Sequence, residues 1–240
     1  MIGILFATEM EAQPFLDRGV PEGVVVEIAE EMGLEAARIA SEKLVHEHGC
    51  STIINAGVCG ALSNRLQRGA VYRVSMVSTE ALKAAVNVGV GIGLKRLVSV
   101  EEPVFDPKRK RELSKYGELV DMEGYAVARV CEEHNIPCIL IKGVTDFGDG
   151  KGKEDIQKHI QPVSETVAEA ILQIIDGVSN SNGNEAINQS GQSKQELHPH
   201  CLKNSIPLLK SNTLYSAFRY CLLGRGWARE GSALRFECCC

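Results

Sequence analysis

Short apolar runs alternate with helix-like segments along the first three quarters of the chain. The runs over residues 2–7, 52–56 and 138–144 are almost free of charge, which is typical of strands that are buried on both faces. Residues 34–48 and 121–134 instead place apolar side chains at helical spacing. This alternation predicts an α/β fold in which a mixed, mainly parallel central sheet is flanked by helices, as in a three-layer sandwich.

The remaining elements have weaker signals. Val-rich segments predict further strands over 23–28, 70–77 and 96–100. A charged segment over 108–115 predicts a short helix, and a last amphipathic helix is expected to open at Pro162. Asp121 is a candidate N-cap for the helix over 121–134.

The chain changes character at residue 177. Residues 1–176 hold 19 Lys and Arg against 27 Asp and Glu, whereas residues 177–240 hold 7 against 4 and include five of the nine cysteines. The junction over 177–191 is rich in Gly, Ser, Asn and Gln, and no apolar periodicity is sustained beyond it. We therefore expect one domain over 1–176, followed by a low-complexity linker and disordered tail over 177–240.

Charge and hydropathy argue against several classes of protein. The formal net charge of −5 disfavours a nucleic-acid-binding protein that depends on phosphate contacts. No apolar run is long enough for a membrane span, and the run over 2–7 lacks the preceding basic residue of a signal peptide. These features predict a soluble cytoplasmic protein that binds neither nucleic acid nor membranes.

The cysteines and histidines match no familiar disulfide or metal pattern. The four cysteines before residue 177 lie in apolar segments without C-x-x-C spacing, which is typical of buried free thiols in a reducing compartment. The segment over 198–201, His-Pro-His-Cys, has no second ligand pair at zinc-finger spacing, and the three terminal cysteines do not form a prenylation box. We expect neither a metal nor a cofactor.

Polar and glycine residues follow the ends of three predicted strands. In α/β sheets the ligand site lies beyond the carboxyl ends of the strands, so these residues are expected to converge on one edge together with the Asp-Met-Glu block at 121–123. The residues that follow the three strands are Thr8, Glu9 and Glu11, then Gly57, Val58, Cys59 and Gly60, and finally Thr145, Asp146 and Asp149.

Several converging carboxyl groups suit the cleavage of a glycosidic or N-ribosidic bond. That reaction needs an acid for the leaving group and a base or nucleophile on the sugar side. Each carboxylate also has a structural explanation. Glu9 and Glu11 suit the first turn of a helix, Asp121 suits a cap, and Asp146 suits a turn.

Four segments resemble the nucleoside phosphorylase/nucleosidase superfamily, in the same order along the chain. They cover residues 3–11, 54–62 (INAGVCGAL), 120–128 (VDMEGYAVA) and 141–146 (IKGVTD). The Asp-Met-Glu block and the strand that ends in Thr-Asp are the more specific of these motifs. The similarity is greatest to the methylthioadenosine/S-adenosylhomocysteine nucleosidases, and it implies a homo-oligomer, most simply a dimer, that binds a small-molecule nucleoside.

The resemblance implies a role for each matching residue. Asp146 matches the aspartate that protonates the leaving purine at N7, and a partly buried carboxyl group with a raised pKa suits that role. Glu11 matches the glutamate that orients and deprotonates the attacking water. Glu123 matches the glutamate that binds the ribose hydroxyls, through hydrogen bonds that strengthen as the sugar becomes cationic.

The remaining matches concern the walls of the substrate site. Met122 lies against the sugar in the family, and the segment from Gly57 through Val58 and Cys59 to Gly60 forms a loop beside ribose and base. Thr145 matches a small hydroxyl residue beside the acid. Phe105 is a candidate for the aromatic residue that stacks on the base, displaced in register.

Three functions remain open on the sequence. Phosphorylases of the superfamily hold phosphate with arginines, one of them at the position of Asn55, and residues 2–13 contain no arginine. This difference and the negative charge of Glu11 favour water as the nucleophile, hence an N-ribosyl hydrolase. The alternatives are a phosphorylase of the same fold and a non-catalytic nucleoside-binding paralogue, since the segment over 78–95 is shorter than the family's base-lining segment.

Overall fold

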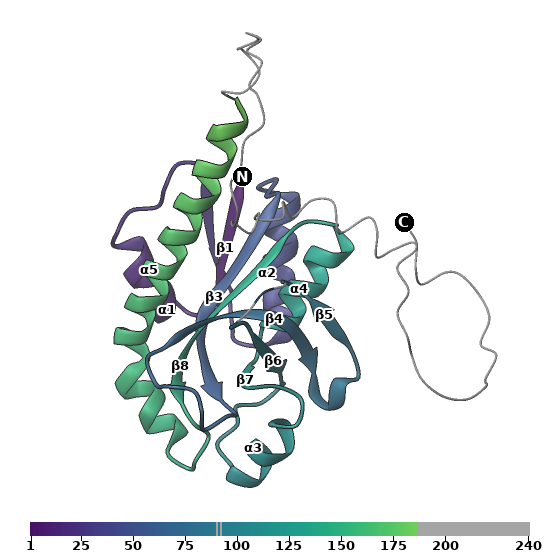
Figure 1. Cartoon of the computed structure of the whole chain (residues 1–240), viewed down its shortest axis with the longest axis vertical. Helices are drawn as coiled ribbons and strands as arrows, with labels where there is room; N and C mark the ends of the chain where they lie inside the picture. The colour runs from purple at the N-terminus through teal and green to yellow at the C-terminus, as the bar shows by residue number, and fades with distance from the viewer. Residues whose placement is uncertain (90, 92, 187–240) are drawn as a thin grey trace, which may run out of the picture. The chain divides into compact units, whose positions relative to one another are not determined.

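The computed structural model describes residues 1–89, 91 and 93–186, which form eight strands, five α-helices and one 3₁₀ turn (Figure 1). The strands are β1 (Ile2–Phe6), β2 (Val24–Ile28), β3 (Thr52–Ala61), β4 (Val71–Thr79), β5 (Ala85–Asn87), β6 (Lys95–Ser99), β7 (Leu119–Asp121) and β8 (Cys138–Asp146). The helices are α1 (Glu9–Leu16), α2 (Leu34–His46), α3 (Pro107–Leu113), α4 (Gly124–Glu133) and α5 (Gly152–Ala186), with the turn η1 at Glu80–Leu82.

The strands form one mixed sheet, part of which closes on itself. β1 lies between β2 and β3, and both pairings are parallel. β3 pairs with β8 in parallel and with β7 antiparallel, β7 pairs with β6, β6 with β4, and β4 with β8. These five pairings form a ring, so β3, β7, β6, β4 and β8 make a closed barrel that β1 and β2 extend on one side and β5 extends on the other.

Helices cover the β1–β3–β8 part of the sheet on both faces (Figure 1). α1 and α5 pack on one face, where Phe6, Phe15 and Ile171 belong to one buried apolar cluster. α2 and α4 pack on the other face around Leu44 and Val127. The packing of α5 is close, because a Cβ on Gly143 of β8 would collide with Val163 and Val167. The face-covering helices explain why the central strands carry almost continuous apolar sequence.

The predicted α/β class is confirmed, together with the mixed, mainly parallel sheet and its flanking helices. Closure into a barrel is a further property that depends on pairings between strands far apart in sequence. β5 and β7 were not predicted, since strands of three residues are too short to show a pattern.

Three local expectations are wrong. Residues 57–60 are not a loop but the second half of β3, because they pair with residues 142–146 of β8. The last helix begins at Gly152, ten residues before Pro162, and the proline lies inside the helix. Asp121 is the last residue of β7, and helix α4 begins three residues later at Gly124.

The described part of the chain ends within α5. The expected domain limit at residue 176 lies inside this helix, which continues to Ala186. Residues 177–186 of the expected linker and tail belong to this helix, and the remainder, including the segment over 198–201 and the terminal cysteines, lies outside the described residues. Within the described residues, no helix combines the length and the apolar character that crossing a membrane requires.

Candidate active site

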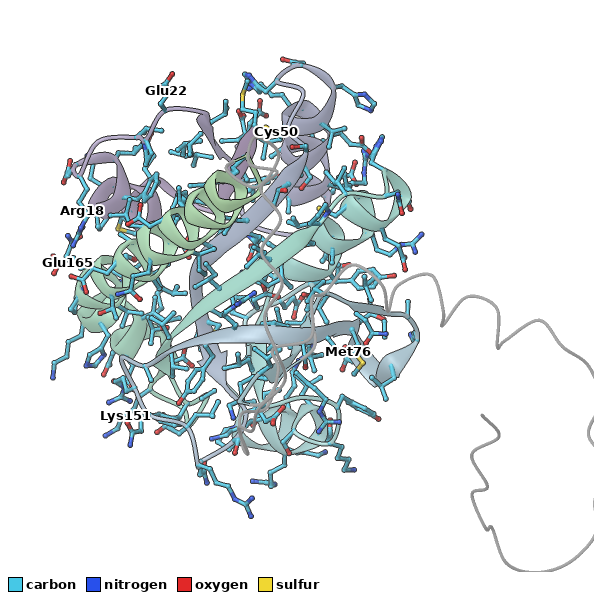
Figure 2. The ribbon with its side chains drawn as sticks, turned by 45° about the horizontal axis from the view of Figure 1, so that its top comes forward. Arg18, Glu22, Cys50, Met76, Lys151 and Glu165 are labelled. Atoms are coloured by element: carbon cyan, nitrogen blue, oxygen red, sulfur yellow. The ribbon has the colours of Figure 1, made fainter. Side chains whose placement is uncertain are left out.

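The pairing of β3 with β8 brings two of the expected segments side by side. In Figure 2, Cys50, which precedes β3, and Lys151, which follows β8, mark opposite ends of this strand pair. Gly57 pairs with Lys142 and Gly60 pairs with Asp146. The glycine segment and the strand that ends in Thr-Asp are therefore neighbours over their whole length.

A bulge at the end of this pairing sets the position of Asp146. The register shifts between Cys59 and Gly60, which leaves Thr145 as an extra residue on β8. Such a bulge re-aims the side chains that follow it. The hydroxyl of Thr145 donates to the Cys59 carbonyl at 3.3 Å and also lies 3.2 Å from Oδ2 of Asp146.

Asp146 is a buried carboxyl group with few polar partners. Its Oδ1 accepts a hydrogen bond of 2.9 Å from the Gly148 N–H, and only 4% of the residue is exposed. Burial raises the pKa of Asp146, while the Gly148 N–H and the Thr145 hydroxyl act in the opposite direction. The group is therefore held toward its protonated form.

Two glycines and one aromatic ring enclose Asp146. A Cβ on Gly60 would lie 3.4 Å from Oδ1 of Asp146. A Cβ on Gly152 would collide with the ring of Phe105 and lie 3.3 Å from the same oxygen. Phe105 and Asp146 thus approach each other across Gly152, which has no side chain.

Glu11, a residue of helix α1, is hydrogen-bonded to Val58 of β3. It lies in the first turn of α1, where Thr8 is the N-cap and donates from its hydroxyl to Oε2 of Glu11 at 2.9 Å. The Val58 N–H donates to Oε1 at 2.7 Å. A Cβ on Gly57 would lie 2.6 Å from the same oxygen, so the approach requires glycine at that position. Burial raises the pKa of Glu11, and the Val58 N–H and the charge of Lys142 oppose that rise.

Lys142 is a buried cation among three carboxyl groups. Its Nζ lies 2.8 Å from Oδ2 of Asp121, and both side chains are at most 2% exposed. Burial disfavours the charge of Lys142, but Asp121 and then Glu123 favour it, and together with Glu11 they raise the pKa of Lys142. The ammonium group is therefore firmly charged.

Asp121 joins this ion pair to the strand and helix around it. Oδ1 accepts from the Ser99 hydroxyl and Oδ2 accepts from the Gly124 N–H at 2.9 Å. The Ser99 hydroxyl oxygen in turn accepts from the Tyr125 N–H at 2.9 Å. β6, β7 and the first turn of α4 are thus joined by one carboxylate, although the N-cap residue of α4 is Glu123 and not Asp121.

Glu123 is the residue immediately before α4. Oε1 accepts from the Gly33 N–H at 3.0 Å, and Oε2 accepts from the Met122 N–H at 3.2 Å. Burial and then the negative charge of Asp121 raise the pKa of Glu123 to about 7, against the opposing charge of Lys142. Met122 is half-buried against the apolar cluster around Val98 and Leu113.

Cys59 lies between Asp146 on one side and the acids around Lys142, namely Glu11 and Asp121, on the other. Burial raises the pKa of its thiol well above the usual range, and the charges of Lys142, Asp121, Asp146 and Glu11 all act on it. The expected residues at Glu11, Gly57–Gly60, Glu123, Thr145, Asp146 and Phe105 therefore occupy one region. Glu9 and Asp149 are exposed and make no contact with the buried carboxyl groups among the contacts of the described residues.

A hollow of about 510 Å³ lies beside residues 147–149, which follow Asp146, and Asp146 itself does not line it. It is lined by Asn64, by Pro107, Lys110 and Arg111 of α3, and by residues 147–149. The cations of Arg68 and Lys110 lie 5.4 and 5.5 Å from the ring centre of Phe147. The carboxyl groups of Glu11 and Glu123 do not line this hollow.

Lys142 and the part played by Asp121 are not predicted by the sequence pattern. A charged residue in the middle of an apolar strand is the available signal for Lys142, because an isolated buried ammonium is too costly to keep without a partner. Asp121 is not the N-cap that the pattern suggests, and nothing local links residue 121 to residue 142.

Part of the chain is similar to a known protein family. Residues 77–178 match the phosphorylase superfamily. The match covers 102 of the 240 residues.

Nucleosidases of the superfamily are similar in sequence over short stretches. The 5′-methylthioadenosine/S-adenosylhomocysteine nucleosidase of Arabidopsis thaliana is 41% identical over 61 residues, which are 25% of this chain and 24% of that protein. The ATP nucleosidase Cap17 of Escherichia coli is 30% identical over 88 residues, which are 35% of this chain and 17% of that protein. The matched stretch thus spans a quarter or less of these relatives.

Solved structures show the same fold over most of the described residues. The Helicobacter pylori methylthioadenosine/S-adenosylhomocysteine nucleosidase in complex with a pyrrolidine inhibitor superposes with a TM-score of 0.68 at 18% identity, covering 73% of this chain and 97% of that chain. The futalosine hydrolase of the same organism gives a TM-score of 0.67 at 17% identity, with the same coverage. Both proteins are named for the cleavage of nucleosides.

The Lys142–Asp121 pair gives a first testable prediction. Replacing Lys142 by Met leaves Asp121 buried without its cation, which should lower the free energy of unfolding by about 3–5 kcal/mol. Adding Asp121→Asn removes the unpaired charge and keeps an acceptor for Ser99, so the double variant should be more stable than Lys142→Met alone. Urea unfolding of the wild type, both single variants and the double variant measures this coupling, and strictly additive effects would contradict it.

Glu123 gives a second prediction, on the pH dependence of stability. A carboxyl group with a pKa of 4.5 unfolded and about 7 folded binds more protons in the folded state over that range. Its contribution to stability is complete below pH 4.5 and is lost as the pH rises to about 7. Relative to Glu123→Gln, the wild type should lose on the order of 1–3 kcal/mol over this interval.

The matched control for this prediction is Glu165→Gln, on the outer face of α5 (labelled in Figure 2), where the side chain is exposed. The difference between this variant and the wild type should not change between pH 4.5 and 7. If the Glu123→Gln curve runs parallel to the wild type in the same unfolding experiments, the raised pKa of Glu123 is refuted.

Proposed function

We propose that this protein hydrolyses the N-ribosidic bond of a purine nucleoside of the methylthioadenosine type. In this reaction Asp146 is the general acid toward the base, and Glu11 orients and deprotonates the water. The observation that carries the proposal is the pairing of β3 with β8. Through it, two buried carboxyl groups with raised pKa values lie at opposite ends of one segment, Gly57–Gly60.

Asp146 suits the acid because burial raises its pKa and so favours its protonated form. It gives its proton to the purine as the C1′–N bond breaks, and the base leaves neutral. In this proposal the ring of Phe105, which meets Asp146 across Gly152, stacks on that base.

Glu11 suits the base because its surroundings differ from those of Asp146. The Val58 N–H and the charge of Lys142 stabilise its ionised form, whereas burial makes that form a stronger proton acceptor. Water attacks C1′ of the ribosyl cation, and its proton passes to Glu11.

Glu123 and Met122 suit the sugar side. Glu123 is buried and is already oriented by the Gly33 and Met122 N–H groups. In its ionised form it can accept hydrogen bonds from ribose hydroxyls, which become stronger donors as positive charge develops on the ring.

The charge balance favours water over phosphate. Among the residues that the structure describes, Lys142 is the one cation among the buried polar side chains, and Asp121 already pairs with it. Glu11 and Glu123 add negative charge beside it. A phosphate dianion would meet net repulsion here, because phosphate sites depend on unpaired arginine or lysine groups.

The direct test is an assay of the full chain with and without inorganic phosphate. We expect 5′-methylthioadenosine to release free adenine in the absence of phosphate. S-adenosylhomocysteine, futalosine and ATP, which the names of the relatives suggest, complete the substrate panel. Release that requires phosphate and yields a sugar 1-phosphate would indicate a phosphorylase, and binding without release would indicate a non-catalytic protein.

The assignment of Asp146 is tested by substitution. Asp146→Asn removes the acid but keeps an acceptor for the Gly148 N–H, so kcat should fall at least about 100-fold while the fold is retained. Asp149→Asn, three residues away on the exposed side of the same turn, is the matched control and should leave kcat within about twofold. An Asp146→Asn enzyme with undiminished kcat would show that another group protonates the base.

A further inference from the structure

Two histidines and a glutamate meet on the face of the molecule formed by α2 and α4. Nε2 of His46 lies 3.1 Å from Oε2 of Glu42, and Nε2 of His134 lies 2.9 Å from the same oxygen. The two imidazole rings are in edge contact, with centroids 4.9 Å apart and an interplanar angle of 81°. One ligand atom from each of the three residues lies within 4.8 Å of the other two.

Helix geometry brings these side chains together. Glu42 and His46 are four residues apart on α2 and therefore share one face of that helix. His134 is the C-cap of α4, which packs beside α2. The cluster thus joins the carboxyl-terminal ends of two adjacent helices.

The same two helices are also joined at their other ends. The N–H of Gly33, the N-cap of α2, donates to Glu123, the residue before α4. The helices are therefore parallel, and a helix of ten residues is about 15 Å long. The histidine cluster lies about that distance from the carboxyl groups of the proposed active site, so it is a separate site.

The ligand set suits a divalent transition metal. Two imidazoles and one carboxylate are ligands for zinc and its neighbours in the first transition series, with water in the fourth position. Zinc–ligand bonds of about 2.0–2.1 Å in a tetrahedral site separate the ligand atoms by about 3.3 Å. Each Nε2 needs to move only a few tenths of an ångström away from Oε2 of Glu42 to reach this spacing, and the ligand nitrogens of the two histidines already lie within 4.8 Å of each other.

The local charges do not oppose a cation. Arg38, which acts on Glu42, is already held by both carboxylate oxygens of Glu35. Arg129 pairs with Glu132 and Glu133 at the end of α4. Solvent reaches the cluster, since the His46 side chain is 64% exposed, so an ion has an open path of entry.

We propose that Glu42, His46 and His134 bind one divalent transition-metal ion, which clamps the ends of α2 and α4 together. The ion takes the place of the hydrogen atoms between each Nε2 and the carboxylate, and each imidazole then carries its hydrogen on Nδ1. The bound ion stabilises the folded chain because the unfolded chain does not hold these three ligands together.

The test counts zinc ions bound by the full chain in equilibrium dialysis. The chain has other possible ligands at 198–201 and at its terminal cysteines, so the informative quantity is the difference between variants. Glu42→Gln, His46→Gln and His134→Gln should each lose one tightly bound equivalent, and the double variant His46→Gln with His134→Gln should lose the same one. His48→Gln, next to the cluster in sequence and not part of it, should lose none.

A second measurement locates the ion and guards against misfolding. Hydrogen exchange should show that zinc slows amide exchange at the ends of α2 and α4 in the wild type and in His48→Gln, and not in His46→Gln, whose exposed side chain makes misfolding improbable. Equal zinc stoichiometry in all variants, or protection confined to other parts of the chain, would overturn the proposal and leave the cluster as a hydrogen-bonded His–Glu–His group.

Discussion

One buried ammonium group governs the electrostatics of this fold. Lys142 extends from the middle of β8, and its ion pair with Asp121 links the central strand pair to the other side of the barrel. A charge with so little exposure is tolerated only where partners surround it, and here three carboxyl groups do so. Each of those groups in turn needs the ammonium, because otherwise three negative charges would share a space from which water is largely excluded. The ion pair therefore joins β8 to β7, and Asp121 in turn joins β7 to β6 and to the start of α4.

Glycine residues give the carboxyl groups of Glu11 and Asp146 room to lie close to the backbone. Glu11 reaches the Val58 N–H only because residue 57 has no Cβ, and Asp146 sits against Gly60 and Gly152 for the same reason. The strand that contains Gly57 and Gly60 is still a member of the barrel, since both residues pair with β8 and Gly60 also pairs with β7. The site is thus built on a rigid strand and not on a loop, which holds the distances between its carboxyl groups constant.

The sequence predicts those features that depend on local pattern. Apolar runs identify the central strands, and the rule that sites follow strand ends leads to Glu11, Glu123 and Asp146. It cannot reveal that β3 and β8 continue together through residues 57–60, since this depends on pairing between segments more than 80 residues apart. For the same reason it does not connect Asp121 with Lys142, or His134 with Glu42 and His46. In each case the missing information is a tertiary contact between residues that are unremarkable in their own segments.

The difference between Glu11 and Asp146 follows from where Lys142 stands. Burial raises the pKa of both carboxyl groups, so burial alone gives neither a distinct role. Lys142 follows the Val58 N–H among the influences that favour the ionised form of Glu11, whereas the ionised form of Asp146 is favoured mainly by the Gly148 N–H and the Thr145 hydroxyl. Lys142 thus favours the charged form of Glu11, and the proposed reaction requires that form together with a proton on Asp146. In the proposed reaction, that is the distribution in which the base can be protonated and the water deprotonated in the same catalytic cycle.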